Sequence, residues 1–314
     1  MSKYLKKFSS ENEYNAYISH NPLFPNVSLI GTTNVRYNPV IEAGTIVYWN
    51  GSTLKYCVPS EWVSSLGTPV AVVVVPNTHT PDSTVRAMAI KGVNADGSQA
   101  SSNVSMVWGP TGTDTGLPNL TSVPTWNNTV GGTIGSNSWA RLSSNNNNGY
   151  FTGSTDCLDE NLKYYNTDGP FIPNPYLQDG TPNPDYRSSM ISNNACADFD
   201  GKGNTSVLVG LGAAYSAANA CHLYNTNGIS AGEWYLPACG ELGYIMSRFN
   251  QIQSSLSTVG GVQLLTGYFY WSSSEDSSVY ARYVYTNYGN VNGNSKTFTF
   301  YVRPFCSLSP FFGF

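Results

Sequence analysis

Charged side chains are scarce in this sequence. Asp, Glu, Lys and Arg make up 11% of its 314 residues, whereas about 25% is usual for soluble domains. Asn, Ser, Thr, Gly and Tyr take their place, which is typical of extracellular or virion β-rich proteins and atypical of cytosolic enzymes. The net charge is −4 and no cluster of Lys and Arg occurs, so the footprint of a phosphate-backbone partner is missing. We therefore expect no nucleic acid among the partners.

Long apolar runs are also missing. No run approaches the roughly 20 residues that span a bilayer, and the longest, residues 69–76, is bounded by prolines and predicts a buried strand. The first eight residues are basic but lead straight into polar residues 9–11, without the apolar segment of a secretory signal peptide. We expect no membrane insertion, synthesis in the cytoplasm of a host cell, and release by lysis.

Catalytic signatures are absent as well. His20, His79 and His222 lie far apart in the chain, and neither a G-x-S-x-G nor an H-E-x-x-H motif occurs. Six cysteines, none of them in a C-x-x-C pair, are expected to be buried free thiols: Cys57, Cys157, Cys196, Cys221, Cys239 and Cys306. The sequence therefore predicts a protein that is not an enzyme and that holds no cofactor.

One oxygen-rich segment, residues 198–204, invites a calcium interpretation. Its acidic residues Asp198 and Asp200 stand in a partial ligand pattern, but Lys202 occupies a position where an EF-hand loop needs an oxygen ligand. We favour a tight turn that leads into a helix, with bound Ca²⁺ as the alternative.

The N-terminal part predicts two regions. Residues 1–43 contain a capping-box pattern at Ser10 and Glu13 and a short helix to about residue 19. This region reads as an arm that docks to other proteins, or else as an ordinary subdomain. Residues 44–95 predict a small antiparallel β module, with a hairpin at Asn50-Gly51 and residues 69–76 as the central strand.

Residues 96–314 are predicted to form the third region, which begins with a loop-rich insertion at 96–197. One apolar stripe then predicts a helix from about residue 204 to 227: Val207, Leu211, Ala214, Ala218 and Cys221. A second helix begins near residue 240 and ends at Gly260-Gly261, and strand-like segments follow to residue 303. The fold class is therefore predicted to be α+β.

Ordered motifs recur over residues 198–306: Trp234-Tyr-Leu-Pro237, Gly240-Glu-Leu242, Tyr270-Trp-Ser-Ser-Ser-Glu275, Ala281-Arg282, Gly289-x-Val291, Lys296 and Tyr301-Val-Arg-Pro304. This part of the chain resembles the C-type-lectin-fold variable proteins, which diversity-generating retroelements diversify in phages and gut bacteria. The resemblance implies a lectin-like domain of two helices and antiparallel strands, with adenine-derived variation at its 3′-encoded end. The N-terminal segment is similar to the start of structural proteins of gut-bacterial phages. The glutamate-proline-asparagine and tryptophan-asparagine-aspartate signatures of calcium-dependent lectins are missing.

Residues 267–305 divide into a structural frame and the residues that lie between the frame positions. Val284 and Thr286 alternate with Tyr283 and Tyr285, so both tyrosines are expected to project outward. The predicted ligand-binding face is made of Tyr, Asn, Ser and Thr, side chains that form adaptable contact surfaces: Tyr268, Tyr270, Ser277, Ser278, Tyr280, Tyr283, Tyr285, Asn287, Tyr288, Asn290, Asn292, Asn294, Thr297 and Thr299. The predicted frame comprises buried Trp271, Phe298, Phe300 and Val302, and four charged residues in structural bonds: Glu275, Arg282, Lys296 and Arg303.

These features predict a virion receptor-binding protein whose diversified face binds a host cell-surface protein or glycan. Its N-terminal segment would contact other virion proteins, and the resemblance favours a homotrimer. Two alternatives are a virion structural or decoration protein whose lectin-like domain serves assembly, and a bacterial surface adhesin.

Overall fold

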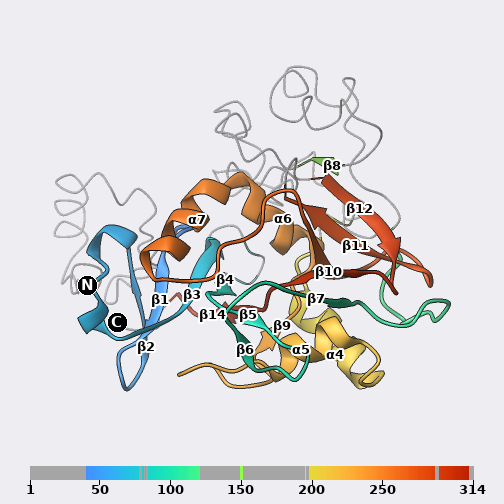
Figure 1. Ribbon diagram of the computed structural model, residues 1–314, viewed down its shortest axis with the longest axis horizontal. Helices are drawn as coiled ribbons and strands as arrows, with labels where there is room; N and C mark the ends of the chain where they lie inside the picture. The colour runs from blue at the N-terminus through green and yellow to red at the C-terminus, as the bar shows by residue number, and fades with distance from the viewer. Residues whose placement is uncertain are drawn as a thin grey trace, which may run out of the picture.

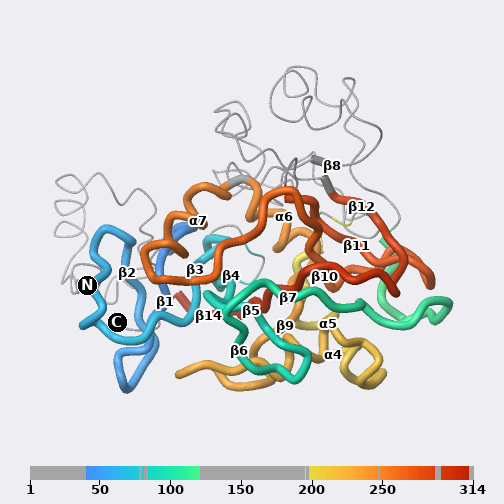
Figure 2. The backbone as a smooth tube through the Cα atoms, viewed as in Figure 1, coloured from blue at the N-terminus to red at the C-terminus, as the bar shows by residue number. Residues whose placement is uncertain are grey.

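The computed structural model describes residues 40–77, 80, 82, 84–120, 149–150, 195, 198–286 and 290–310 (Figures 1 and 2). The predicted N-terminal arm before residue 40 and most of the insertion at 96–197 lie outside the described residues. The same holds for His20, His79, Cys157 and Cys196.

The first sheet has six strands in the order β2-β1-β3-β4-β14-β9, and all its pairings are antiparallel. Its strands are β1 (Ile46–Trp49), β2 (Leu54–Cys57), β3 (Thr68–Val75), β4 (Val85–Ala89), β9 (Trp234–Tyr235) and β14 (Phe305–Leu308). The predicted hairpin is confirmed, and the Asn50 Oδ1 atom accepts hydrogen bonds from the backbone N–H groups of Ser52 and Thr53 at 3.0 and 2.9 Å. Two short 3-10 helices, η2 (Pro59–Glu61) and η3 (Ser64–Leu66), link β2 to β3.

This sheet unites distant parts of the chain. Strand β14 lies between β4 and β9, with Cys306 opposite both Ala87 and Trp234 (Figure 2). The predicted central strand β3 lies inside the same sheet. The structure therefore does not separate residues 44–95 as a module of their own, because their strands share hydrogen bonds with residues 305–308.

The second sheet carries the stretch predicted to bind ligand. Its order is β7-β13-β10-β11-β12-β8, in which only the β10–β13 pair is parallel. The strands are β7 (Val104–Val107), β8 (Gly149–Tyr150), β10 (Phe269–Glu275), β11 (Tyr280–Tyr285), β12 (Asn290–Ser295) and β13 (Thr299–Val302). A further two-stranded sheet joins β5 (Gly92–Val93) to β6 (Gln99–Ala100).

Each of the two predicted helices is in fact a pair. The first comprises α4 (Gly201–Gly210) and α5 (Ser216–Leu223), and the second comprises α6 (Cys239–Ser247) and α7 (Phe249–Thr258). The single helix predicted for 204–227 is wrong, because Gly212 adopts φ +116° and ends the first half. Val207 and Leu211 of the predicted apolar stripe are consequently exposed, at 42% and 48%.

The helices cover opposite sides of the sheets (Figure 1). Alternate residues of β3 enter two separate cores: Val73 packs in the core that contains α5, whereas Val72 packs in the core that contains α6 and α7. Burial on both faces explains the continuous apolar run of β3, which lacks the polar alternation of a half-exposed strand. The fold is α+β, as predicted, with mostly antiparallel sheets.

A buried ion pair fastens the second helix pair to the first sheet. The Glu241 Oε1 atom in α6 accepts a hydrogen bond from Arg86 Nε in β4 at 2.7 Å, and Oε2 accepts one from the Ala238 backbone N–H at 2.9 Å. The second bond caps the N-terminus of α6. Burial raises the pKa of Glu241 to about 7, although Arg86 acts to lower it.

Candidate binding face

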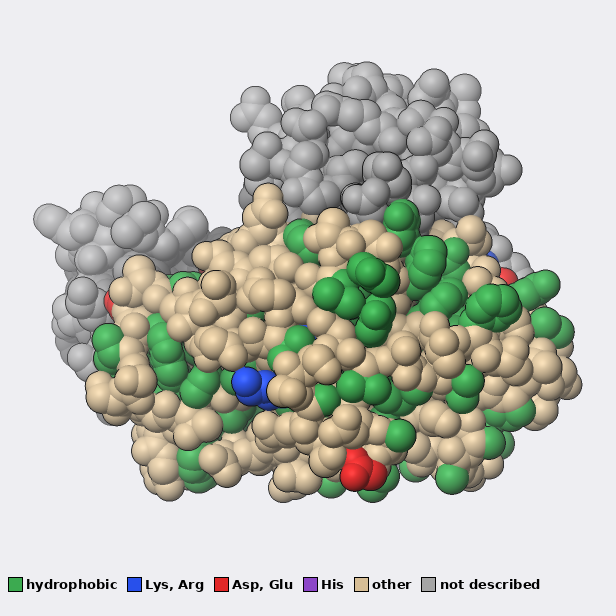
Figure 3. Space-filling model, in the orientation of Figure 1, with side chains coloured by type: hydrophobic (Ala, Val, Ile, Leu, Met, Phe, Trp, Pro, Cys, Tyr) green, Lys and Arg blue, Asp and Glu red, His purple; other side chains and the backbone are tan. Residues whose placement is uncertain are grey.

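One side of the second sheet presents aromatic and amide side chains together. The register of β10, β11 and β12 sets Phe269 opposite Tyr285, Trp271 opposite Tyr283, and Tyr283 opposite Asn292. Directly opposed residues of antiparallel strands project to the same side of a sheet. Figure 3 shows hydrophobic side chains gathered over this sheet.

Four rings form an aromatic stack, which we define as Tyr285, Phe269, Phe300 and Trp271. The ring centroids of Phe269 and Tyr285 are 4.8 Å apart with an interplanar angle of 29°, and those of Phe269 and Phe300 are 4.9 Å apart at 37°. Phe300 continues to Trp271 at 4.4 Å and 35°. These distances are those of favourable offset contacts between aromatic rings. The stack therefore leads from the solvent-accessible rings of Phe269 and Tyr285 to the fully buried ring of Trp271.

Tyr283 braces this stack from the side. Its ring meets Phe269, Trp271 and Phe300 at interplanar angles of 77°, 76° and 75°, with centroid distances of 5.1, 6.2 and 5.0 Å. The side chain is half-buried, and its burial raises the pKa of the Tyr283 hydroxyl. Tyr283 projects to the predicted side of the sheet, where it packs against the aromatic stack and is also partly exposed.

Next to the stack, β12 contributes an amide row, which we define as Asn292 and Asn294. The Oδ1 atoms of both residues accept hydrogen bonds from the next backbone N–H, at 2.8 Å from Gly293 and 2.8 Å from Ser295. These bonds fix each carboxamide by its oxygen, so the amide Nδ2 groups are the hydrogen-bond donors that a ligand would meet. Val291, between the strand's Asn residues, is buried on the other side.

The charged residues beneath this face point inward. The buried Glu275 and Lys296 side chains form an ion pair. Lys296 Nζ also donates to the Thr113 carbonyl at 3.0 Å and lies 5.0 Å from the centroid of the Trp108 ring. Glu275 Oε2 accepts from the Thr115 hydroxyl at 2.5 Å. The pair therefore ties the strand β10 to the loops that follow β7 and β12, in the structural role that the sequence predicts.

Arg282 and Arg303 have similar structural roles. Arg282 donates to the Leu120 carbonyl at 2.8 and 3.0 Å and to Asp276 Oδ1 at 2.9 Å. Burial raises the pKa of Asp276, and the adjacent Arg282 acts to lower it. Arg303 donates to the carbonyls of Ala89 and Val262 and to Asn103 Oδ1, at 3.1, 3.0 and 2.8 Å. All four predicted structural charges are thus in the interior of the protein.

Apart from Tyr270, which is buried, the predicted site residues fall into three groups. Exposed side chains comprise Tyr268, Tyr280, Thr297 and Thr299. Partly buried side chains comprise Ser277, Ser278, Tyr283, Tyr285, Asn292 and Asn294. Asn287 and Tyr288 lie outside the described residues, and Asn290 is described for its backbone alone.

The prediction that Tyr270 belongs to the face is wrong. Its side chain is 1% exposed and projects to the opposite side of the sheet from Phe269 and Trp271. There its hydroxyl donates to Asn103 Oδ1 at 3.1 Å and accepts from the Leu265 backbone N–H at 3.0 Å. Alternation along a strand assigns neighbouring residues to different faces, and here Phe269 has the outward position.

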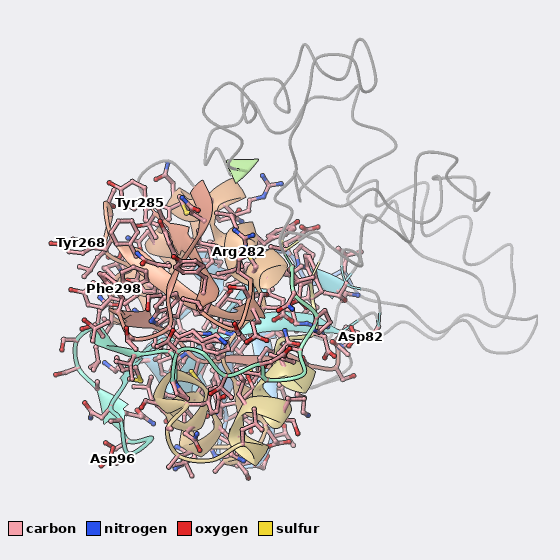
Figure 4. The ribbon with its side chains drawn as sticks, turned by 90° about the vertical axis from the view of Figure 1, so that its right-hand side faces the viewer. Asp82, Asp96, Tyr268, Arg282, Tyr285 and Phe298 are labelled. Carbon is pink, nitrogen blue, oxygen red and sulfur yellow. The ribbon has the colours of Figure 1, made fainter. Side chains whose placement is uncertain are left out.

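The prediction that Phe298 is buried is also wrong, because this side chain is 54% exposed. Its backbone N–H donates to the Ser295 carbonyl at 2.9 Å, so Phe298 lies in the turn before β13 and outside the strand's alternation. The predicted burial of Phe300 and Val302, which lie within the strand, is confirmed. Tyr285, Tyr268 and Phe298 lie along the same side of the molecule (Figure 4).

Phe269 and Phe298 are therefore two exposed aromatic residues of this stretch that sequence reasoning missed. The signal for Phe269 is its even spacing from Trp271, which puts both on the side of Tyr283. Tyr280 is separate from this group, because five residues of β11 place it about 17 Å along the strand from Tyr285.

The segment considered for calcium leads into α4 through a hydrogen-bonded turn. Asp200 is the N-cap, and its Oδ1 atom accepts from the Gly203 backbone N–H at 3.0 Å. Asp198 Oδ2 accepts from the Ser274 hydroxyl at 2.6 Å and from Asn204 Nδ2 at 2.8 Å. Within the described ranges, no three His, Cys, Asp or Glu side chains are grouped in a way that could hold a metal ion. None of the helices in those ranges combines the length and hydropathy of a membrane-spanning segment.

Comparisons with known proteins do not assign this chain to a family. No protein-family model and no curated protein matches the chain. Among solved structures, the chain is similar to a fimbrial protein from Bacteroides ovatus ATCC 8483, with 15% identity and a TM-score of 0.40, over 85% of this chain and 49% of that one. The chain spans about half the length of that fimbrial protein. Similarity at this level carries no inference about fold or function.

Proposed function

We propose that this protein is a receptor-binding adhesin whose aromatic and amide face attaches to molecules on a host cell surface. The observation that supports this proposal is the contrast within residues 267–305: the charged side chains are turned inward, and large rings remain accessible at the surface. Exposed Tyr268 and Phe298 add accessible aromatic area on the same side of the molecule as Tyr285 (Figure 4).

The arrangement favours binding because the face is pre-organised. The accessible ring of Phe269 stacks on the buried ring of Phe300, and the ring of Tyr285 stacks on Phe269, so little side-chain freedom remains to be lost when a ligand binds. Contact over a few rings gives modest affinity at one site. Several copies on one particle would multiply it through avidity.

We further propose that the protein belongs with the C-type-lectin-fold variable proteins, and that it works in a phage virion as a homotrimer attached through its N-terminal segment. The motifs of residues 234–304 and the inward-facing frame under a Tyr- and Asn-rich surface support this reading. Adenine-biased codon differences confined to residues 268–300 among sibling isolates would support it. Evenly spread or silent differences would refute it.

The adhesin proposal is tested by whole-cell binding. Fluorescently labelled protein is incubated with a panel of gut bacterial strains, and cell-bound fluorescence is measured for the wild type, Phe298→Ala and Leu211→Ala. Leu211 is a matched control, because it is a similarly exposed apolar residue of helix α4's C-terminal cap. We expect the wild type and Leu211→Ala to bind at least one strain and Phe298→Ala to bind weakly.

Two outcomes contradict the proposal. The wild type binds no strain although it is folded, or Phe298→Ala binds as well as the wild type. If the protein instead self-associates through this face, and Phe298→Ala abolishes that association, the face is an assembly contact of a virion structural protein.

A further inference from the structure

The surface that residues 267–305 present to solvent carries no free charge. This stretch has five charged residues, which are Glu275, Asp276, Arg282, Lys296 and Arg303. The side chains of Glu275 and Lys296 are 0% exposed, Arg282 is 5% exposed, and Arg303 is 1% exposed as a residue. Asp276 retains 19% side-chain exposure, but its Oδ1 atom is bound to Arg282 at 2.9 Å.

This neutrality restricts the chemistry of a ligand. A phosphate, sulfate or carboxylate ligand is commonly bound by Arg, Lys or a helix N-terminus. In residues 267–305 both arginines and the lysine are committed to the interior. A cationic ligand would need an unpaired carboxylate, but Glu275 is paired with Lys296 and Asp276 is paired with Arg282. An uncharged ligand is therefore the best electrostatic match.

The remaining groups are ring faces and amides. The face of an aromatic ring is electron-rich, and it attracts C–H groups that carry partial positive charge. The ring plane of a pyranose sugar offers several such C–H groups together, while its hydroxyl groups accept and donate hydrogen bonds at the rim. Phe298 supplies a ring with 54% exposure, and the Nδ2 groups of Asn292 and Asn294 supply hydrogen-bond donors.

We propose that this face binds an uncharged glycan by stacking sugar rings on Phe298 and on the outer end of the aromatic stack, with the amide row contacting sugar hydroxyls. The inference rests on the proposed adhesin function and names its ligand class. No cation takes part in such binding, and salt has little effect on it, because the charged side chains of residues 267–305 are buried or paired with one another.

The first experiment is affinity electrophoresis in native gels. The gels contain dextran, yeast mannan or arabinogalactan as neutral polysaccharides, and heparin or polygalacturonate as charged ones. We expect at least one neutral polysaccharide to retard the wild type equally in 0.05 and 0.5 M NaCl and with or without EDTA. Retardation by charged polymers alone, or binding that EDTA abolishes, overturns the proposal.

Substitutions at Phe298 separate ring stacking from general apolar contact. Phe298→Tyr keeps the ring and is expected to bind as the wild type does. Phe298→Leu keeps apolar area but has no ring face, so its affinity is expected to fall about tenfold. Leu211→Ala is the control elsewhere on the surface. Equal binding by Phe298→Leu and the wild type contradicts the proposal, since an apolar protein partner would tolerate that change.

Cell binding distinguishes failure of this inference from failure of the adhesin function. Cells are treated with periodate, which cleaves the vicinal diols of sugars, or with proteinase K, which removes surface proteins. Binding lost after periodate and retained after proteinase supports the glycan. Binding lost after proteinase and retained after periodate identifies a protein receptor, so the glycan inference fails while the adhesin function stands. Absence of any cell binding contradicts the adhesin function, and the gels then decide the glycan inference alone.

Discussion

Glu275 and Lys296 form an ion pair between two side chains that have no exposed surface, although they are 21 positions apart in the chain. The pair lies under the strands whose outer residues are proposed to vary. The charged side chains of this stretch thus lie inside the scaffold and not on its surface.

Replacing Lys296 with Met should lower the free energy of unfolding by about 3–5 kcal/mol, because the Glu275 carboxylate would stay buried without its cation. Urea denaturation measures the loss. Lys202→Met in helix α4 is the control, since Lys202 is exposed and its replacement should change the value by about 0.5 kcal/mol or less. Equal effects of the two substitutions would show that the buried pair adds no stability.

Replacing Tyr283 with Ala should destabilise the protein by about 2–3 kcal/mol. A fully buried aromatic residue costs about 3–5 kcal/mol when truncated to Ala, and Tyr283 is half-buried among three rings. Phe298→Ala should change stability by about 0.5 kcal/mol or less, because that side chain is mostly in solvent. Thermal unfolding measures both, and Tyr283→Phe should restore most of the loss. A reversed order of the two Ala variants would mean that Phe298 has the supporting role.

Stability should fall as the pH rises from about 5 to 8, through the titration of Glu241. Burial raises its pKa from the ordinary 4.5 to about 7, Asp198 acts in the same direction, and Arg86 opposes both. The folded protein therefore holds this proton more tightly than the unfolded chain. The stabilisation is complete below about pH 4.5 and is lost as the pH passes through about 7.

The test compares the pH dependence of the melting temperature in the wild type and Glu241→Gln. The Gln side chain does not titrate, so its variant should lack the part of the slope that Glu241 causes. Any constant loss of stability that the Gln variant suffers through its altered contact with Arg86 does not change the slope over this pH range. Parallel curves for the two proteins would place the pKa of Glu241 outside the range.

The buried cysteines should resist alkylation in the folded protein. Burial raises the pKa of Cys221 and Cys306 well above the ordinary range, and burial together with Glu61 raises that of Cys57 to about 11. The thiolate is the reactive form, so iodoacetamide at pH 7.5 should leave these residues unmodified until urea is added. Peptide mass spectrometry locates the modified sites. Rapid labelling of Cys306 in the native protein would contradict its position between β4 and β9.

Local patterns predicted the parts of this fold that depend on local physics. Asn50-Gly51 predicts a hairpin because the Asn50 side chain accepts hydrogen bonds within its own turn. The structural role of the charged residues was predictable because a buried charge without a partner costs free energy. Tyr270 and Phe298 were mispredicted for a different reason. For Tyr270, the alternation of side chains along a strand does not show which of two large neighbouring residues faces outward. For Phe298, the alternation ends at a turn, and the position of that turn depends on the partner strand.

Long-range pairing was beyond prediction from this sequence. Nothing local to residues 305–308 indicates that they join β4 and β9, because strand pairing depends on the partners that the remaining fold brings near. The same limit explains why residues 44–95 read as a module of their own. The second sheet was easier to anticipate, since its strands β10, β11 and β12 are neighbours in sequence.

The position of β14 has a consequence during synthesis. The Cys306 Sγ atom lies against the Ala87 carbonyl of β4, 219 positions earlier in the chain. Because the ribosome adds about 5–20 residues per second, roughly 10–40 s pass between the synthesis of β4 and that of β14. During this time the edge of β4 that pairs with β14 has no partner strand. An open edge of apolar strand readily pairs with another chain. The protein is therefore expected to need protection by a chaperone as a nascent chain, and its folding is completed only when the segment beyond the binding face has emerged.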